Sequence, residues 1–279
     1  MIQVGIDIGS TTAKVVALDK EYNILYTKYE RHNAKTKEVL TDILKELQAK
    51  VGDVEAEIKI TGSVGFGFSE QLGISFIQEV VASTKAIQKY HPEASTMIDI
   101  GGEDAKIVFF KDSEATDLRM NGNCAGGTGA FIDQMAIILG VSINELNNLA
   151  LNATQVHPIA SRCGVFCKTD IQNLVAKNVC KEEIAASIFH AVAVQTIITL
   201  AHGCNINTPV LFCGGPLTYL PALRKAFIDY LALKDQDVII PQNGTLLPAL
   251  GAAISQSENI NVYRLSEFIR LLCNDLKRT

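Results

Sequence analysis

Short apolar runs alternate with stretches of helical periodicity along the whole chain. The apolar runs are rich in Val and Ile and end at glycine or polar residues, which is typical of buried strands. The predicted strands comprise residues 2–8, 13–18, 57–61, 96–100, 105–110 and 209–213. The predicted helices comprise residues 35–51, 81–90, 130–140, 143–151, 169–178, 182–203, 246–255 and 261–279, with a further helix start at Pro216. This mixed order predicts an α/β fold.

The sequence contains an internal repeat. "DIGSTTAK", from Asp7 to Lys14, returns as "DIGGEDAK", from Asp99 to Lys106, and five of the eight positions are identical. Each copy joins two predicted strands through a glycine turn, where backbone N–H groups can approach an anion closely. An aspartate at the end of such a strand can hold a magnesium ion. Two matching copies favour a pair of phosphate-binding turns over two unrelated hairpins, and they predict two similar lobes around a cleft.

Three further stretches are rich in glycine or other small residues. In "LFCGGP", from Leu211 to Pro216, paired glycines between a strand and a helix leave room for a flat ring or a phosphate. "PALGAA", within residues 246–255, is a small-residue helix that can pack closely at the junction of the lobes. "GSVGFGF", from Gly62 to Phe68, lacks the Lys and Ser/Thr ending of a P-loop. We interpret it as a structural or cleft-lining turn, with contact to a partner or to the nucleotide edge as the alternative.

Composition excludes several classes of protein. The net charge of −5, without blocks of like charge, argues against nucleic acid and anionic membranes as partners. The apolar stretch 182–203 carries His190 and Gln195, which favours a core helix over a membrane span. The start of the chain lacks a signal pattern, so we expect a cytoplasmic protein whose seven cysteines stay reduced. Metal, cluster or core roles for the cysteines therefore come before disulfides.

Together, "DIGSTTAK", "DIGGEDAK", "LFCGGP" and "PALGAA" resemble the phosphate, phosphate, adenosine and connecting motifs of the acetate and sugar kinase, Hsp70 and actin superfamily. The resemblance implies two actin-like (ribonuclease H-like) lobes with a duplicated βββαβα-type core around a nucleotide cleft, and ATP or ADP with Mg²⁺ as cofactors. Lobe I would comprise residues 1–93 and 246–279, and lobe II residues 94–245. Since that superfamily contains kinases, chaperones and filaments, it does not by itself give the function.

The cysteine motifs narrow the choice. "NCAGGTGAFIDQMA" and "SRCGVFCKTDIQNL" resemble the ATP-dependent activators of 2-hydroxyacyl-CoA dehydratases, in the same family as the benzoyl-CoA reductase ATPase subunits. In that family each protomer of a homodimer supplies two cysteines to one [4Fe-4S] cluster, and the matching positions are Cys124 and Cys163. Two thiolates per chain cannot complete a four-cysteine cluster, so a two-fold axis through the cluster satisfies the count. Cys124 and Cys163 each precede a predicted helix, whose N-terminal dipole favours a thiolate and a reduced cluster.

The resemblance implies an ATPase that delivers low-potential electrons to a partner iron-sulfur enzyme. A 2-hydroxyacyl-CoA dehydratase is the first choice of partner, with a benzoyl-CoA reductase core or a similar reductase left open, and reduced ferredoxin or flavodoxin is the expected donor. Asp7 and Asp99 would organise Mg²⁺ and the attacking water, and Glu103 stands where the activators are expected to carry glutamine. The cofactor-binding candidates are Gly9, Ser10, Thr11, Thr12, Lys14, Gly101, Gly102, Asp104, Gly127, Gly214, Gly215 and Pro216.

The other cysteines have plainer interpretations. Cys167 follows Cys163 by one helical turn and is either a spare ligand or, as we favour, a neighbouring core or second-layer thiol. A zinc site of His157, Cys163 and Cys167 lacks a familiar ligand spacing. Four more cysteines accompany apolar segments and are predicted to lie in the core: Cys180, Cys204, Cys213 and Cys273.

Two rival functions use the same nucleotide motifs. A small-molecule kinase would need a substrate pocket, usually built from inserted segments, and this chain shows no obvious insertion. A non-redox ATP-dependent switch or chaperone would leave both cysteine motifs unexplained. The electron-transfer interpretation accounts for more of the sequence than either rival.

Overall fold

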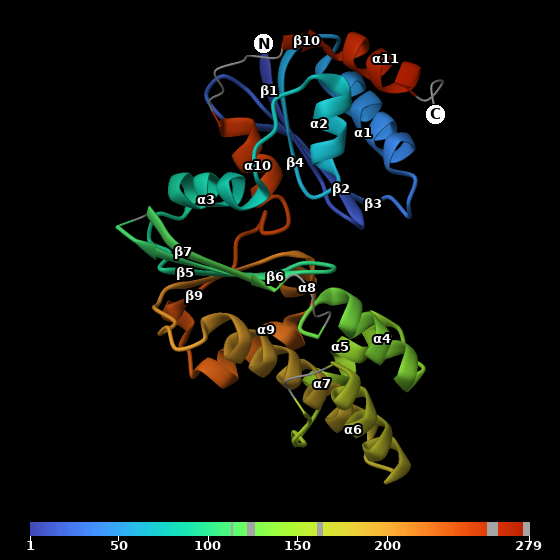
Figure 1. The fold of residues 1–279 in the computed structure, drawn as a ribbon, viewed down its shortest axis with the longest axis vertical. Helices are drawn as coiled ribbons and strands as arrows, with labels where there is room; N and C mark the ends of the chain where they lie inside the picture. The colour runs from blue at the N-terminus through green and yellow to red at the C-terminus, as the bar shows by residue number, and fades with distance from the viewer. Residues whose placement is uncertain (113, 122–125, 161–163, 256–261, 276–279) are drawn as a thin grey trace. The chain divides into compact units, whose positions relative to one another are not determined.

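The computed structural model describes residues 1–112, 114–121, 126–160, 164–255 and 262–275. Within these ranges the chain forms two compact units, each built on a five-stranded sheet (Figure 1). Unit 1 comprises Met1–Pro92 and Thr245–Thr279, and unit 2 comprises Glu93–Gly244. The predicted α/β class is confirmed.

The sheet of unit 1 has the strand order β10-β4-β1-β2-β3. Strand β1 pairs antiparallel with β2 and parallel with β4, while β10 lies antiparallel on the outer side of β4. The strands are β1 (Ile2–Ile8), β2 (Thr12–Leu18), β3 (Ile24–Arg31), β4 (Glu55–Thr61) and β10 (Val262–Arg264). The helices of this unit are α1 (Thr36–Val51), α2 (Gly65–Leu72), α3 (Glu79–Tyr90), α10 (Leu247–Ile254) and α11 (Leu265–Asp275).

Alternate residues of β1 face different helices, because successive side chains of a strand point to opposite faces. Ile6 and Ile8 belong to a core that includes apolar side chains of α1, α2 and α11. Gly5 faces α10, where the backbone of Ala249 and Ala253 leaves no room for a Cβ. Gly251 of α10 meets the backbone of α3 in the same way. The small residues of the "PALGAA" stretch therefore serve close packing within unit 1.

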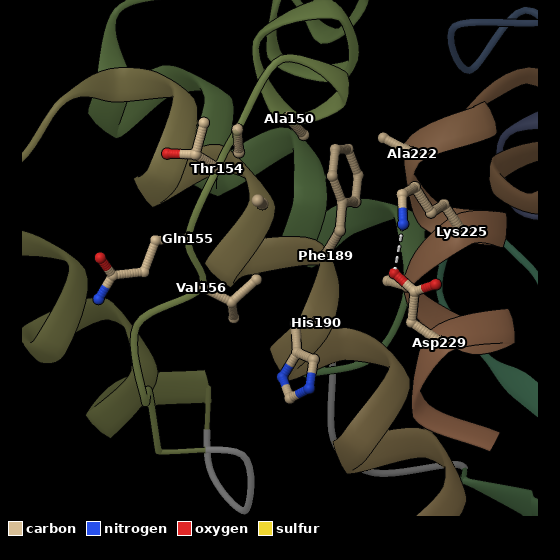
Figure 2. A pocket seen from close by; sticks show the side chains of 12 residues that line it. Ala150, Thr154, Gln155, Val156, Phe189, His190, Ala222, Lys225 and Asp229 are labelled. Carbon is tan, nitrogen blue, oxygen red and sulfur yellow. Dashed lines mark hydrogen bonds and ion pairs between the residues drawn. The ribbon is translucent and has the colours of Figure 1, made fainter. Parts of the chain in front are cut away.

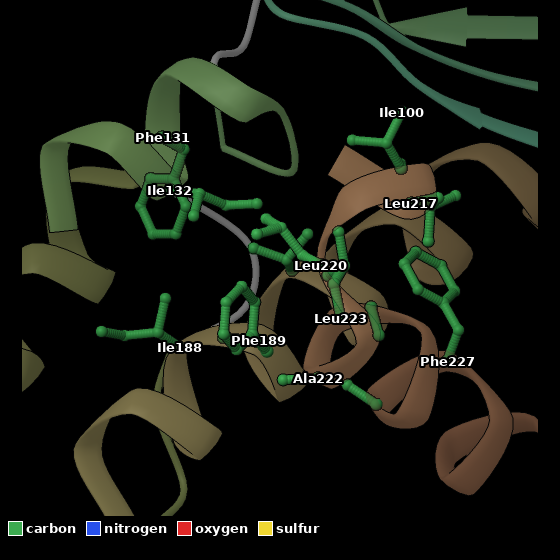
Figure 3. Packing of buried hydrophobic residues seen from close by; sticks show 14 of the residues in the cluster. Ile100, Phe131, Ile132, Ile188, Phe189, Leu217, Leu220, Ala222, Leu223 and Phe227 are labelled. Atoms are coloured by element: carbon green, nitrogen blue, oxygen red, sulfur yellow. The ribbon is translucent and has the colours of Figure 1, made fainter. Parts of the chain in front are cut away.

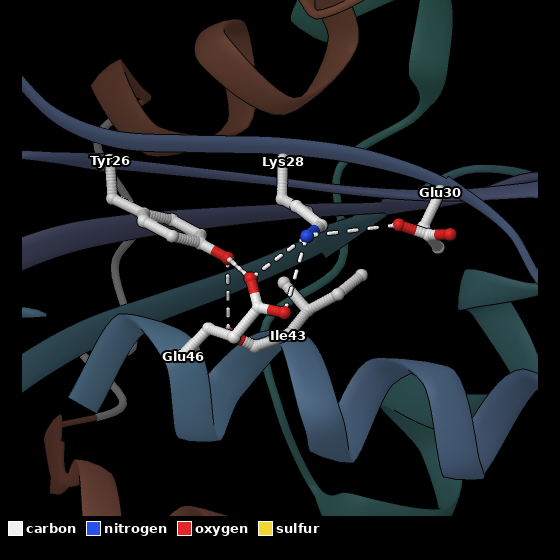
Figure 4. Close-up of polar contacts among 5 residues, drawn as sticks. All are labelled: Tyr26, Lys28, Glu30, Ile43 and Glu46. Carbon is white, nitrogen blue, oxygen red and sulfur yellow. Dashed lines mark hydrogen bonds and ion pairs between the residues drawn. The ribbon is translucent and has the colours of Figure 1, made fainter. Parts of the chain in front are cut away.

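Hydrogen bonds and an ion pair connect β3 to α1 on the surface of unit 1 (Figure 4). The Tyr26 hydroxyl donates to Glu46 Oε2 at 3.1 Å, and Lys28 Nζ lies 2.9 Å from the same oxygen. The Lys28 and Tyr26 hydrogen bonds lower the pKa of the Glu46 carboxyl. Burial, followed by the bond to Glu46, raises the pKa of Tyr26. Lys28 is half-buried and Glu46 is exposed, so water screens the pair and it contributes little to stability.

The sheet of unit 2 repeats most of this arrangement in the order β7-β6-β5-β8-β9. Strand β5 pairs antiparallel with β6 and parallel with β8, as β1 does with β2 and β4. The outer strand differs, because β9 runs parallel to β8. The strands are β5 (Thr96–Ile100), β6 (Ala105–Lys111), β7 (Glu114–Asn121), β8 (Val210–Cys213) and β9 (Val238–Ile239). The internal repeat of the sequence is therefore a repeat of sheet topology.

The core of unit 2 is formed by apolar side chains from the sheet and the helices around α7. Phe131 and Ile132 of α4 lie near Ile188 and Phe189 of α7 (Figure 3). The helical elements are α4 (Gly129–Leu139), α5 (Ile143–Leu151), α6 (Gly164–Ala176), α7 (Lys181–Thr196), η1 (Ile197–Ala201), α8 (Gly215–Tyr219), α9 (Pro221–Leu231) and η2 (Asp235–Asp237). By length and composition Lys181–Ala201 could cross a membrane, but 72% of its most apolar window is buried inside unit 2. It is therefore the expected core helix.

Two helix boundaries in unit 2 differ from the sequence prediction. The helix predicted over 169–178 already begins at Gly164, because Cys167 and Ile171 bury one face of it a turn apart. The apolar stretch predicted as one helix over 182–203 changes from α-helix to a π-helical turn, η1, after Thr196. Tertiary packing rather than local propensity decides both boundaries.

Candidate functional site

The first repeat motif places a charged pair on neighbouring strands of unit 1. Asp7 on β1 is the register partner of Lys14 on β2 and of Thr61 on β4. Lys14 Nζ lies 2.6 Å from Asp7 Oδ2, and Asp7 is only 1% exposed. Thr61 Oγ1 is buried and has no hydrogen-bond partner. The row Asp7, Lys14 and Thr61 thus gathers a carboxylate, an ammonium group and a hydroxyl on three adjacent strands.

Unit 2 presents the corresponding row of three residues. Asp99 on β5 is the register partner of Lys106 on β6 and of Cys213 on β8. Asp99 and Lys106 are both buried, and Lys106 Nζ lies 2.9 Å from Asp104 Oδ2 in the turn between the two strands. The structure therefore places the two candidate aspartates at equivalent positions of two similar sheets.

The two glycine turns also share their backbone geometry. In unit 1 the N–H of Gly9 donates to the carbonyl of Thr12 at 3.0 Å, and in unit 2 Gly101 donates to Asp104 at 2.8 Å. Ser10 and Thr11 are exposed at the first turn, and so is Glu103 at the second. The exposed hydroxyls of Ser10 and Thr11, together with backbone N–H groups of a turn, are the kind of donors that phosphate binding requires.

A third pair of equivalent positions was missed by sequence reasoning. Gly62 follows β4 with φ +94°, and Gly214 follows β8 with φ +85°. At Gly62 a Cβ would overlap Asp7 Oδ1, and at Gly214 it would overlap Asp99 Oδ1. Gly62 and Gly214 thus each lie against the candidate aspartate of their own unit. The start of "GSVGFGF" is therefore the unit 1 counterpart of the predicted adenosine motif in unit 2. The sequence did offer a signal for this pair. In each unit a glycine directly follows the strand that pairs parallel with the strand carrying the candidate aspartate.

The second turn is bonded to the start of α4. The N–H of Gly129 donates to the carbonyl of Gly101 at 2.9 Å, and Ala130 donates to Gly102 at 2.8 Å. A Cβ on Gly129 would lie 3.2 Å from Pro216 Cγ. Three predicted elements of unit 2 meet at this point: the second repeat turn, the "LFCGGP" motif, and the helix that follows the first cysteine motif.

The predicted cluster ligands Cys124 and Cys163 lie outside the residues that the structure describes. Their described neighbours do lie together. An added Cβ on Gly164 would be 3.7 Å from Gly126 Cα and 3.5 Å from Phe131 Cδ2. Helix α4 begins three residues after Gly126, and α6 begins at Gly164. The structure therefore brings the C-terminal sides of both cysteine motifs into contact within one unit.

The described part of the chain contains no group of three or more His, Cys, Asp or Glu side chains arranged to hold a metal. His157, from the zinc alternative, contacts Glu183 Oε2 at 2.7 Å through Nε2. Cys167 is 1% exposed, and burial, followed by the charge of Asp170, raises the pKa of its thiol to about 12. Such a thiol stays protonated, which suits a core residue rather than a metal ligand.

The remaining cysteines divide between core and surface. Cys213 is buried as expected, whereas Cys204 and Cys273 are half-buried. The prediction of a core position was wrong for Cys180, which is exposed. It occupies the N-cap position of α7, where the chain enters the helix from the surface.

A cavity of about 230 Å³ lies elsewhere in unit 2, beside the end of α5, α7 and α9 (Figure 2). Phe189 supplies apolar surface, and the polar or charged lining comes from Thr154, Gln155, His190, Lys225 and Asp229. None of the predicted site residues lines this cavity. It is therefore distinct from the turns described above.

Comparison with known proteins decides the family. The model of the BadF/BadG/BcrA/BcrD ATPase family matches residues 4–255. The chain belongs to this family of ATPases. It is 29% identical to the 2-hydroxyisocaproyl-CoA dehydratase activator of Clostridioides difficile over 91% of this chain and 94% of the relative. It is 31% identical to the (R)-2-hydroxyglutaryl-CoA dehydratase activating ATPase of Acidaminococcus fermentans over 76% of this chain and 81% of that protein.

The solved structures of these two relatives share the fold of this protein. Component A of the A. fermentans dehydratase matches with a TM-score of 0.80 and 27% identity, covering 91% of this chain and 96% of that one. The C. difficile activator, solved with bound ADPNP, matches with a TM-score of 0.78 and 26% identity, covering 100% and 98%. The predicted resemblance to dehydratase activators and the actin-like ATPase fold are thereby confirmed. Family and relatives support an ATP-dependent activator role.

Proposed function

We propose that this protein is an ATP-hydrolysis-driven electron donor that reduces and thereby activates a partner iron-sulfur enzyme. The observation that carries the proposal is the contact between Gly126 and Gly164 in unit 2. Each glycine follows one of the two proposed cluster cysteines within a few residues, so this contact supports a site shared by the two cysteine motifs. The family and the two activator relatives supply the functional context.

In the proposed nucleotide chemistry each unit contributes one aspartate. Asp7 and Asp99 would bind Mg²⁺ or its water ligands, and the ammonium group of Lys14 would neutralise charge beside Asp7. Exposed hydroxyl and backbone N–H groups of the two turns would hold phosphate oxygens. Glycine at positions 62 and 214 lets the backbone lie directly against the carboxylates of Asp7 and Asp99, since any Cβ there would overlap them.

Glu103 would change how this protein hydrolyses ATP. Its side chain is exposed in the second turn, next to Asp104 and Gly102. A carboxylate is a stronger base than the glutamine expected of an activator, and it also binds Mg²⁺. Glu103 would therefore orient or deprotonate the attacking water.

The proposed cluster would be a [4Fe-4S] group held by Cys124 and Cys163 from each of two protomers. When bound, it would store one electron at low potential for transfer to the partner. The starts of α4 and α6 would turn their N–H groups and dipoles toward the cluster and stabilise its reduced form. Val165 and Phe166, two and three residues after Cys163, are 72% and 66% exposed. Exposed apolar side chains at this place fit a surface that another chain covers.

The proposed partners follow from this chemistry. Reduced ferredoxin or flavodoxin would supply the electron, and a 2-hydroxyacyl-CoA dehydratase would accept it, as the names of the relatives suggest. The protein would act in the cytoplasm, where low-potential thiolate clusters and ATP are both maintained.

Iron and acid-labile sulfide per protein dimer, after anaerobic purification, test the proposal. We expect about four irons per dimer in the parent and their loss in Cys124→Ala and Cys163→Ala. Cys180→Ala is the matched control, because Cys180 is exposed and should leave the iron content unchanged. A parent that hydrolyses ATP but binds no iron would contradict the proposal and would return a kinase or a non-redox switch to consideration.

A further inference from the structure

His32 is a buried histidine that belongs to none of the sequence motifs. It directly follows β3 in unit 1 and is 4% exposed. Its Nε2 atom lies 3.0 Å from the carbonyl oxygen of Gly9, at the start of the first glycine turn. Its backbone N–H donates to the carbonyl of Thr11 at 3.1 Å, near the end of the same turn. One residue therefore contacts the turn at two places.

The hydrogen bonds of the His32 ring determine which of its nitrogens carries the proton. Nδ1 accepts the N–H of Ala34 at 3.3 Å, so Nδ1 is the nitrogen without a proton. In a neutral ring the proton then lies on Nε2, which donates to the carbonyl of Gly9. The ring is thereby fixed as a donor toward the turn.

The backbone after His32 adopts a conformation that residues other than glycine rarely take. Asn33 has φ +45° and Ala34 has φ +65°. Alanine lacks the short polar side chain that helps asparagine adopt this region. The two residues turn the chain so that the N–H of Ala34 reaches Nδ1 of His32. Backbone strain of this kind concentrates at functional sites, and here it fixes the orientation of the ring.

The bonds to His32 decide where the N–H groups of the first turn point. In a trans peptide the C=O and N–H bonds point in opposite directions. Because the carbonyl of Gly9 faces the His32 ring, the N–H of Ser10 points away from it. The carbonyl of Thr11 faces the backbone of His32, so the N–H of Thr12 also points away. His32 thus holds two carbonyl oxygens, which would repel phosphate, on its own side and directs two N–H donors to the other.

The equivalent turn of unit 2 restrains the corresponding carbonyl with a different donor. Gly101 is the counterpart of Gly9, and its carbonyl accepts the backbone N–H of Gly129 at 2.9 Å. Both units therefore place a hydrogen-bond donor on this carbonyl. In unit 1 the donor is a side chain, which substitution can remove.

We propose that His32 is a positioning residue for ATP hydrolysis, which holds the first turn with its N–H groups directed at nucleotide phosphate. The inference rests on the proposed function only in that this turn binds phosphate, and it does not depend on the cluster. Without the Nε2 donor the peptide between Gly9 and Ser10 is free to rotate, so phosphate meets the Gly9 carbonyl oxygen as well as the Ser10 N–H. Binding should therefore weaken for ligands that carry phosphates and persist for adenosine, which carries none.

A matched pair of amide variants tests the role of the donor. The amide nitrogen of His32→Gln can reach the position of Nε2, whereas that of His32→Asn stops near the position of Nδ1. In His32→Asn the Kd for ADPNP should rise about tenfold, as for one lost hydrogen bond to a charged site, while the Kd for adenosine stays unchanged. His32→Gln should restore most of the ADPNP affinity. His202→Asn is the control, because His202 is exposed and lies in unit 2.

Competition against a fluorescent ATP analogue, in anaerobically purified protein, gives these affinities. An unchanged Kd for ADPNP in folded His32→Asn would overturn the inference. So would equal losses in His32→Asn and His32→Gln, or a loss for adenosine as large as that for ADPNP, since His32 would then serve packing alone. An iron-free parent whose variants follow the expected pattern would remove the proposed electron transfer and support the role of His32.

The ring itself provides a second measurement, which needs no variant to bind nucleotide. In nitrogen-15 NMR spectra of the histidine-labelled parent at pH 8, the His32 ring should show the form protonated on Nε2. Its signals are those missing from His32→Gln. A ring protonated on Nδ1 would overturn the inference, because no proton would then join Nε2 to the carbonyl of Gly9.

Discussion

Lys14 and Asp7 are direct cross-strand partners, and Lys14 Nζ lies 2.6 Å from Asp7 Oδ2 in a nearly buried position. The same register recurs between Lys106 and Asp99 in unit 2. Removing one member of such a pair leaves the other charge buried without its partner, which is more costly than removing both.

Lys14→Met should therefore lower the unfolding free energy by about 3 kcal/mol. Asp7→Asn added to it should restore part of that loss while ATP hydrolysis falls further, because the proposed magnesium ligand is then absent as well. Urea unfolding of both single variants and the double variant, followed by circular dichroism, measures the coupling. If the losses of unfolding free energy in the two single variants simply add up in the double variant, the two side chains do not interact in solution.

Gly62→Ala and Gly214→Ala should both impair nucleotide binding. Each position has a positive φ, and each added Cβ would overlap the carboxylate of Asp7 or Asp99. The backbone strain alone costs about 1–3 kcal/mol. The protein has no tryptophan, so a fluorescent ATP analogue is the suitable probe. Gly67→Ala, in open space, should bind the analogue like the parent. Normal binding of the analogue by Gly62→Ala would show that "GSVGFGF" is not part of the nucleotide site.

Thiol alkylation at pH 8 should distinguish the described cysteines by burial. Cys180 is exposed and should react quickly, whereas Cys167 and Cys213 should resist until the protein unfolds. Mass mapping after brief treatment with iodoacetamide gives the readout. Rapid labelling of Cys167 in the folded protein would contradict its place in the core.

Alkaline pH should destabilise the folded protein through the buried thiol of Cys167. Its folded pKa of about 12 exceeds the ordinary value of 9.0, so the unfolded chain loses the proton first as pH rises. Stability due to the neutral thiol is complete below pH 9.0 and is lost progressively towards pH 12. The fall in thermal midpoint over this interval should be smaller in Cys167→Ala than in the parent, once each is referred to its own value at pH 8.

Acidic pH should weaken the attachment of β3 to α1. Lys28 and Tyr26 hold the pKa of Glu46 below its usual value of 4.5. The stabilisation is therefore present above pH 4.5 and is lost as pH falls through the lower folded pKa. Thermal midpoints of the parent and of Glu46→Gln should converge on acidification. Because the pair is exposed, the difference should be small and should shrink in high salt.

The sequence by itself determined the features that depend on short-range order. The repeat "DIGSTTAK" and "DIGGEDAK" predicted two equivalent turns, because adjacent residues suffice to form a strand, a glycine turn and a strand. Helix α5 begins and ends where its periodicity predicted, since Ser142 accepts the N–H of Glu145 and caps it locally. The cysteine motifs likewise indicated the family, since the motif residues are contiguous.

Only the tertiary structure decided which distant segments meet. The equivalence of Gly62 and Gly214 became visible through their contacts with Asp7 and Asp99, which come from other strands. The same holds for the bonds from Gly129 to the second turn and for the surface position of Cys180. Local propensity sets which backbone conformation a segment prefers, but burial and contact depend on how separate segments pack, and that packing is a property of the whole chain.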